Sequence, residues 1–304
     1  MSLKRALDRP DSPLRRFVDA RLPYGDEARA PWGAALRQVR PVPFPKPPAG
    51  EDVPTAAIGH ALRARVLWEF VPLDEARLRD GAELVVEAGA DPTTVADLLD
   101  ALDARRPGNV ERAARLAWHA GLLDRVARTG RTDDPTTQPL LATTSLDGLV
   151  AAAPGRWVRD VMAVADLAWD PLRDLRSAAT AEGGAGARAA VALPVAAAVA
   201  AAAGDSATAD ELAGLEAGLV VAGTLLDLSA TASPKARARD LEVLVLTALL
   251  DLDDELGITE VAVAPLRFGA CIAWDLEGLL GELADAEVRV ADVRADLRAA
   301  LERG

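Results

Sequence analysis

The chain has 304 residues, half of them apolar, and a formal net charge of −13 at pH 7. This length and composition are typical of a folded protein with a substantial core, in one large domain or two smaller ones, and argue against disorder. The acidic balance argues against nucleic-acid binding over the whole surface, because acidic groups repel phosphates.

The single cysteine, Cys271, excludes an internal disulfide and a zinc site built from clustered cysteines. No apolar run follows the basic residues of the first ten positions, so no signal peptide is expected. The most membrane-like stretch, residues 189–204, contains Pro194 and is shorter than the roughly 18 residues that a spanning helix needs. We therefore predict a cytoplasmic protein that does not enter a membrane.

Charge is unevenly distributed along the chain. Residues 1–50 hold ten Lys or Arg against five Asp or Glu, a net charge of +5, which leaves −18 for residues 51–304. Arg15, Arg16 and Arg21 in this basic end are candidate contacts to a phosphate or an acidic partner. The alternative, which we favour, is that the basic end lies against the protein's own acidic body or is solvated.

The first half of the chain predicts helices. Ser12-Pro13 begins a short helix over residues 14–22, and residues 41–48 form a proline-rich connector. Further helices are expected over 55–70 and 74–87, after Asp91-Pro92 and after Asn109, whereas residues 130–148 are turn-rich and mark a boundary. Residues 1–140 are thus predicted to be a helical N-terminal region with a basic arm and a proline-rich connector.

The second half mixes helices and strands. We expect a helix over 156–179, a strand at 189–193, a hairpin at 216–229, a helix over 233–257, strands at 259–265 and 269–274, and a C-terminal helical tail. The predicted fold class is α/β, mostly α by residue count, with a small mixed sheet around a central hairpin. Residues 141–304 form the predicted core domain.

The hairpin "EAGLVVAGTLLDLSAT" has a predictable register. With Ala222 and Gly223 as a two-residue turn, Val221 opposes Thr224 and Leu219 opposes Leu226. Counting further places Gly218 opposite Asp227 and Glu216 opposite Ser229. Alternation puts these four residues on one face and Leu219, Val221, Leu226 and Leu228 on the other.

This order of elements and this hairpin resemble the PD-(D/E)XK nuclease superfamily in its RecB-like branch. A group of bacterial proteins of uncharacterised role is similar over "GLEAGLVVAGTLLDLSAT", "ALLDLDDELGI" and "RFGACIAW", and more faintly over "SPLRRFVDARLP" and "AIGHALRARVLWEF". The good similarity spans about residues 205–280, roughly a quarter of the chain. It implies a nuclease-like core in which two carboxylates hold a divalent metal and a lysine positions the nucleophile.

The chain departs from that pattern at four positions. Gly218 stands at the first acid, Ser229 at the lysine, and Val243 and Thr247 at a glutamine and a tyrosine of the following helix. Of the residues that the resemblance implies, Asp227 alone is kept. Two facing carboxylates would repel by about 3 to 4 kcal/mol at an effective dielectric near 20 unless a cation lay between them, so the loss of one removes the reason for a metal.

A displaced catalytic site is the alternative. It would use Asp227 as the metal ligand together with Glu216, Lys235 and Glu242, and would need Mg or Mn. Glu216 lies two strand residues from Gly218, roughly 6.6 Å away, so it replaces the missing carboxylate only after a shift in register.

Other candidate sites are weaker. Ser229 has no predicted base beside it, and His60 and His119 fall within helical patterns where packed, hydrogen-bonded histidines are expected. The acids Asp251, Asp253, Asp254 and Glu255 lack calcium-loop spacing and favour a solvated or partner-facing helix end over a metal site.

The sequence therefore predicts a pseudonuclease-like protein without a cofactor, acting as a scaffold or regulatory subunit with a protein partner in a nucleic-acid-processing or defence assembly. The two other hypotheses are a metal-dependent nuclease with displaced residues and a nucleic-acid binder that uses the basic N-terminal end.

Overall fold

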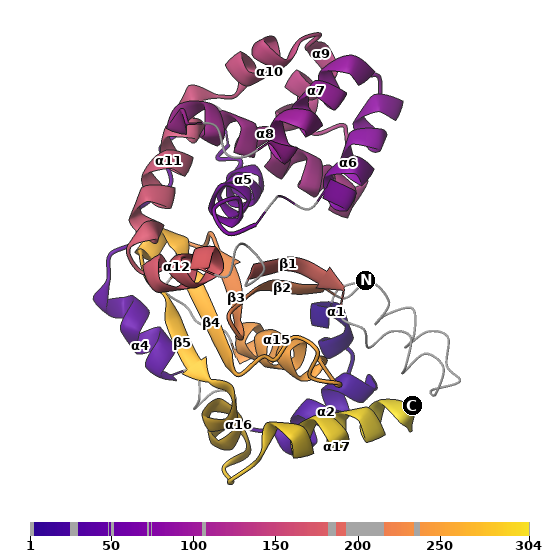
Figure 1. Ribbon diagram of the computed structural model, residues 1–304, viewed down its shortest axis with the longest axis vertical. Coiled ribbons are helices and arrows are strands. Elements are labelled where there is room, and N and C mark those ends of the chain that lie inside the picture. The colour runs from indigo at the N-terminus through magenta and orange to yellow at the C-terminus, as the bar shows by residue number, and fades with distance from the viewer. Residues whose placement is uncertain are drawn as a thin grey trace.

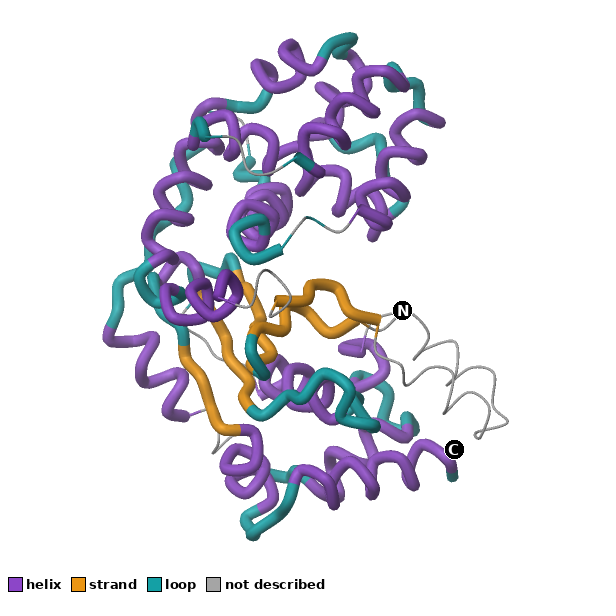
Figure 2. Tube along the Cα trace, in the orientation of Figure 1, coloured by secondary structure: helices purple, strands orange, loops and turns teal. Residues whose placement is uncertain are grey.

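A computed structural model of the chain describes residues 3–24, 30–47, 49, 52–71, 73, 75–104, 108–181, 187–192, 216–233 and 238–303. The described part is mostly helical, with a small mixed sheet in the C-terminal part. Helices α5 (Thr55–Leu67), α8 (Val110–Thr129) and α11 (Gly155–Trp169) lie on one side of the sheet and α15 (Ala238–Leu249) on the other, as Figure 1 and the tube view of Figure 2 show.

The helices of the first side follow one another along the chain. They are α5 (Thr55–Leu67), α6 (Glu75–Glu87), α7 (Pro92–Asp103), α8 (Val110–Thr129), α9 (Gln138–Ala142), α10 (Leu146–Ala152), α11 (Gly155–Trp169) and α12 (Arg173–Ala181), with a short 3₁₀ helix, η1 (Pro135–Thr137). Two of the predicted caps are confirmed. The Asp91 carboxylate accepts the backbone N–H of Thr94, and the Asn109 side chain accepts that of Arg112.

Glycines allow close contact at the centre of this helical layer. A Cβ at Gly121 of α8 would lie 2.4 Å from the backbone nitrogen of Ala61 in α5, and one at Gly81 of α6 would lie 2.2 Å from the carbonyl oxygen of Leu123. The neighbouring backbone therefore leaves no room for a side chain at position 81 or 121. The central helix α8 thus touches α5 and α6 directly.

Among the described residues, the sheet has five strands in the order β1-β2-β3-β4-β5. They are β1 (Ala187–Ala192), β2 (Glu216–Val221), β3 (Thr224–Ser229), β4 (Glu260–Pro265) and β5 (Ile272–Asp275). β3 and β4 are parallel, and the other neighbours are antiparallel. The parallel pair is joined by α15 (Ala238–Leu249), as a crossover requires.

The other side of the sheet is covered by elements from both ends of the chain. One buried cluster joins α1 (Leu3–Leu7), α2 (Pro13–Arg21) and α4 (Ala30–Gln38) with α15, α16 (Leu276–Ala284) and α17 (Val290–Glu302). Val220, Leu225, Val261 and Val263 are the sheet residues in this cluster. The second cluster contains the opposite sheet residues, among them Leu219 and Leu226, with the helices from α5 to α12.

Several predicted elements differ from the structure. The helix expected over 156–179 is two helices, α11 and α12, because Pro171 lies between them and cannot continue a helix. The helix expected to reach Gly257 ends at Leu249, and the one expected to reach Phe70 ends at Leu67. Residues 130–148, expected to be a loop, include η1, α9 and part of α10.

The division predicted at residue 140 stays a prediction. The buried clusters group the chain differently, because α1, α2 and α4 pack with the C-terminal helices, and α8 and α11 share one cluster across residue 140. Within the described residues, no helix is both long and apolar enough to cross a membrane.

Candidate functional site

The hairpin of β2 and β3 forms with the predicted turn. Ala222 and Gly223 have positive φ angles of 47° and 81°, as a tight hairpin turn requires, and Val221 pairs with Thr224 and Leu219 with Leu226. A Cβ at position 223 would lie 3.1 Å from the Gly257 carbonyl oxygen, so glycine fits there best. Leu219, Val221, Leu226 and Leu228 share one buried cluster, which confirms the predicted apolar face.

The β2–β3 ladder ends sooner than predicted. Its last pair is Leu219–Leu226, so the expected pairs Gly218–Asp227 and Glu216–Ser229 are not part of it. A Cβ at Gly218 would lie 3.3 Å from the Leu226 carbonyl oxygen, a tight contact, and 3.9 Å from Nη2 of Arg63 in α5. An arginine therefore approaches the position at which the resemblance implies a metal-binding carboxylate.

Asp227 lies in β3 with its side chain exposed to solvent. Protein atoms surrounding the carboxylate nevertheless reduce its hydration, and this desolvation raises its pKa. The positive charge of Arg63 acts in the opposite direction, and the charges of Asp240 and Lys4 contribute with opposite signs. Asp227 thus lies among charged residues of α5, α15 and α1.

Ion pairs join the N-terminal helices to α15, and one of them contains Lys4 and Asp240, whose charges act on Asp227. Nζ of Lys4 donates to Asp240 at 3.1 Å. Glu242 accepts hydrogen bonds from Arg15 of α2 at 3.1 Å and from Arg239 at 2.9 Å. These contacts satisfy Glu242 within the protein and attach α1 and α2 to α15.

Of the four residues of the displaced-site hypothesis, Asp227 and Glu242 are those whose side chains the structure describes. Asp227 is exposed in β3, whereas Glu242 lies in α15 and is bound by the two arginines. The backbone of Glu216 is in β2, but its side chain and the whole of Lys235 lie outside the described residues. In the described part of the chain, no three His, Cys, Asp or Glu residues lie where they could hold a metal ion.

The other departures from the nuclease pattern have local roles. The Ser229 hydroxyl accepts the backbone N–H of Thr231 at 3.4 Å. On α15, Thr247 donates to the Val243 carbonyl oxygen one turn earlier at 2.7 Å, and Val243 packs against the buried cluster. Neither Val243 nor Thr247 offers a free polar group equivalent to the glutamine and tyrosine that the resemblance implies.

The basic N-terminal end contacts the acidic body of the protein. Arg15 pairs with Asp19 as well as with Glu242, and Arg21 pairs with Asp296 of α17. The hydrogen bonds and charges of Asp19 and Glu242 raise the pKa of Arg15, the bond to Asp19 being the largest cause. These pairs match the intramolecular alternative; nucleic-acid binding through Arg15, Arg16 and Arg21 stays a prediction.

Both histidines are hydrogen-bonded, as expected. Nδ1 of His60 lies 2.7 Å from the Asp124 carboxylate, which also binds Arg128. His119 is fully buried, and its Nε2 lies 2.8 Å from the Leu149 carbonyl oxygen. Because that acceptor needs a donor, Nε2 carries the proton, and burial lowers the pKa of His119 to about 4.

The acidic run after α15 meets basic residues of α17. Asp254 accepts from Arg294 at 2.6 Å and Asp253 from Arg298 at 2.7 Å. The same arginines also donate to the carbonyl oxygens of Ala248 and Leu252, respectively. The partner that this acidic helix end needs is therefore a helix of the same chain.

Arg63, Lys4 and Asp240, the charged residues that act on Asp227, were not predicted from the sequence. Lys4 and Arg63 come from elements far from the hairpin in sequence, whereas Asp240 lies in α15, the next helix after it. No local pattern distinguishes Arg63 from other helix-surface arginines. The sequence does not indicate which of these elements lie close together, so their proximity is seen only in the folded structure.

Comparisons with known proteins add no identification. No protein-family model, no curated protein and no solved structure matches the chain.

Proposed function

We propose that the chain is a non-catalytic protein with a degenerate PD-(D/E)XK-like core that acts as a scaffold or regulatory subunit for a protein partner in a nucleic-acid-processing or defence assembly. The sequence order of helix, strand, hairpin, helix and strand, on which the resemblance rests, recurs in the observed succession α12, β1, β2–β3, α15 and β4. This agreement supports the nuclease-like origin of the core.

The observation that carries the proposal is the position of Arg63. Its guanidinium lies beside Gly218, where a second carboxylate would be needed, and its charge acts on Asp227. A divalent cation at this place would lack a carboxylate at position 218 and would be repelled by the positive charge of Arg63. The positive charge of Arg63 therefore partly offsets the negative charge of Asp227, as a metal cation would do in a nuclease site.

Catalysis by a displaced set of residues requires the surrounding ion pairs to break. Glu242 would have to leave Arg15 and Arg239 before it could bind a metal with Asp227. The Arg15–Glu242 pair also attaches α2 to α15, so its loss would disturb the packing of these two helices. The non-catalytic proposal needs no such rearrangement.

A nuclease assay tests the proposal. Wild-type protein and the Asp227→Ala variant are incubated with single-stranded DNA, double-stranded DNA and RNA in the presence of Mg²⁺ or Mn²⁺. We expect no hydrolysis that differs between the two proteins. Metal-dependent cleavage by the wild type that disappears in Asp227→Ala would overturn the proposal and favour the displaced-site nuclease.

A further inference from the structure

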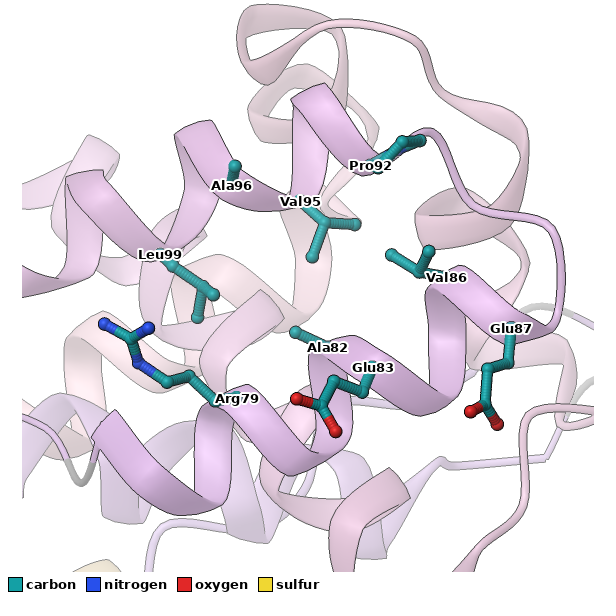
Figure 3. Close-up of a pocket in the computed structure, with 9 residues that line it drawn as sticks. All are labelled: Arg79, Ala82, Glu83, Val86, Glu87, Pro92, Val95, Ala96 and Leu99. Carbon is teal, nitrogen blue, oxygen red and sulfur yellow. The ribbon is translucent and has the colours of Figure 1, made fainter.

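A groove with a volume of about 410 Å³ lies between α6 and α7, far along the chain from the hairpin. Figure 3 shows apolar side chains of the two helices pointing toward each other across it, and the Glu83 and Glu87 carboxylates on the α6 side. Arg79 lies at one end. The apolar lining residues are Ala82, Val86, Pro92, Val95, Ala96 and Leu99.

The packing of α6 explains why space is left beside α7. At Gly81 the backbone of α6 contacts the backbone of α8 directly, which holds α6 close to α8. The facing positions of the α6–α7 pair include the small residues Ala82 and Ala96, which fill little of the space between the helices. An apolar groove open to solvent remains, with Val86 and Leu99 half-buried in it.

Two unpaired acids give the groove a charge preference. Glu83 and Glu87 are exposed and lie one helical turn apart, and neither forms a hydrogen bond or ion pair within the described part of the chain. Like charges at this spacing destabilise a helix slightly. A partner with positive charges one helical turn apart would relieve this repulsion.

We propose that this groove binds an amphipathic α-helix of a protein partner, with an apolar ridge flanked on one side by Lys or Arg. The lining residues of α6 span positions 79 to 87, which is about 12 Å along the helix. This length matches about two turns of a bound helix, whose apolar anchor residues would be spaced by one and two turns. The apolar ridge packs between α6 and α7 in the manner of ridges into grooves, and the basic side faces Glu83 and Glu87.

A basic amphipathic helix would be the kind of protein partner that the proposed scaffold function requires. It does not depend on the state of the hairpin site, because α6 and α7 contribute no residue to the surroundings of Asp227 described above. Failure of the non-catalytic proposal would therefore leave the groove proposal intact, and the reverse also holds.

A designed peptide serves as the probe. It is a fluorescein-labelled amphipathic helix about 18 residues long, with leucines on one face and lysines beside them, and its binding to the full chain is measured by fluorescence anisotropy. We expect saturable binding that weakens as salt rises. A second peptide with glutamates in place of the lysines should bind much more weakly; equal binding of the two peptides would overturn the charge preference.

Variants separate binding in the groove from general attraction to an acidic protein. Glu83→Lys/Glu87→Lys should weaken binding about tenfold, and Ala96→Arg, at an exposed lining position, should weaken it at least as much. The matched control is Asp97→Lys/Asp100→Lys, which makes the same charge change at exposed positions of α7 outside the groove. Binding to this control should be close to wild type.

Three outcomes would overturn the proposal. They are no binding of the lysine peptide, equal weakening by the control variant, and self-association of the wild-type chain that Ala96→Arg abolishes. The last outcome would assign the groove to a second copy of the chain. Circular dichroism of each variant shows that it is folded, and Arg63→Ala should leave peptide binding unchanged.

Discussion

Nη2 of Arg63 lies 3.9 Å from the place that a Cβ at Gly218 would occupy, so a side chain restored at position 218 would meet a guanidinium before it could meet a metal. Under the proposed function, this relationship between a helix of the first half and a strand of the second is the main feature that distinguishes the site from a metal-binding one. It also shows which residues must change together.

Restoring the carboxylate should therefore require removal of the arginine. We expect Gly218→Asp alone to bind no Mn²⁺, because the new carboxylate pairs with Arg63, and the Gly218→Asp/Arg63→Ala double variant to bind it measurably in calorimetry. Arg63→Ala alone is the control and should show no binding. Equal Mn²⁺ affinity of the single Gly218→Asp variant and the double variant would mean that Arg63 does not oppose the metal.

Asp227→Asn should stabilise the protein modestly at neutral pH. Desolvation raises the folded-state pKa of Asp227, so the unfolded state loses its proton first and stability falls as pH rises from about 3.8 through the raised pKa. The gain should be well under about 1 kcal/mol because the carboxylate reaches solvent, and it should vanish below pH 3.8. Urea unfolding of both proteins across this pH range measures the difference; a destabilised Asp227→Asn at neutral pH would contradict it.

His119 should make stability depend on pH in a different window. Its folded pKa is lowered to about 4, so the stability associated with the neutral, buried ring is present above pH 6.5 and is lost as pH falls toward 4. The loss from this residue is at most about 3 kcal/mol. His119→Gln, which can still donate to Leu149, should show a flatter pH profile than wild type between pH 6.5 and 4. An unchanged slope would show that the ring is not neutral when buried.

The buried pair of Arg267 and Asp160 should behave as a coupled unit. Arg267 donates to both carboxylate oxygens of Asp160 and to the Val42 carbonyl oxygen. Its Cζ atom lies 3.7 Å from the centroid of the Phe44 ring. Asp160→Ala leaves a buried charge without its partner and should cost about 3 to 5 kcal/mol.

Replacing both members tests that explanation. Asp160→Leu/Arg267→Met should recover most of the lost unfolding free energy, although the bond to Val42 is lost, because no buried charge remains. A double-mutant cycle, with Asp160→Leu and Arg267→Met as its single variants and the free energy of unfolding in urea as its readout, gives the coupling energy. Strictly additive effects of the two single substitutions would show that the pair is not coupled.

Local chemistry explains which elements the sequence predicts correctly. The hairpin turn is signalled by Gly223, because glycine adopts a positive φ without strain, and the starts of α7 and α8 follow from side-chain caps at Asp91 and Asn109. Pro171 is also a local signal, and it accounts for the break between α11 and α12 within the single helix predicted over 156–179.

Long-range contacts explain what the sequence did not predict. The helix expected to reach Gly257 ends at Leu249; the following turn is held by Asp251, which accepts the backbone N–H groups of Glu255 and Leu256, and by Arg294 of α17. Arg63 likewise reaches Gly218 from a distant helix. Neither α17 nor α5 reveals in its own residues which part of the chain it will contact.

Calorimetric titration of the full wild-type chain with Mn²⁺, alongside Asp227→Ala, tests the central claim most directly. We expect the two titrations to be the same, because Arg63 repels a cation beside Asp227 and position 218 offers no carboxylate. Mn²⁺ binding by the wild type that is lost in Asp227→Ala would contradict the proposed function and would favour the metal-dependent nuclease with displaced residues.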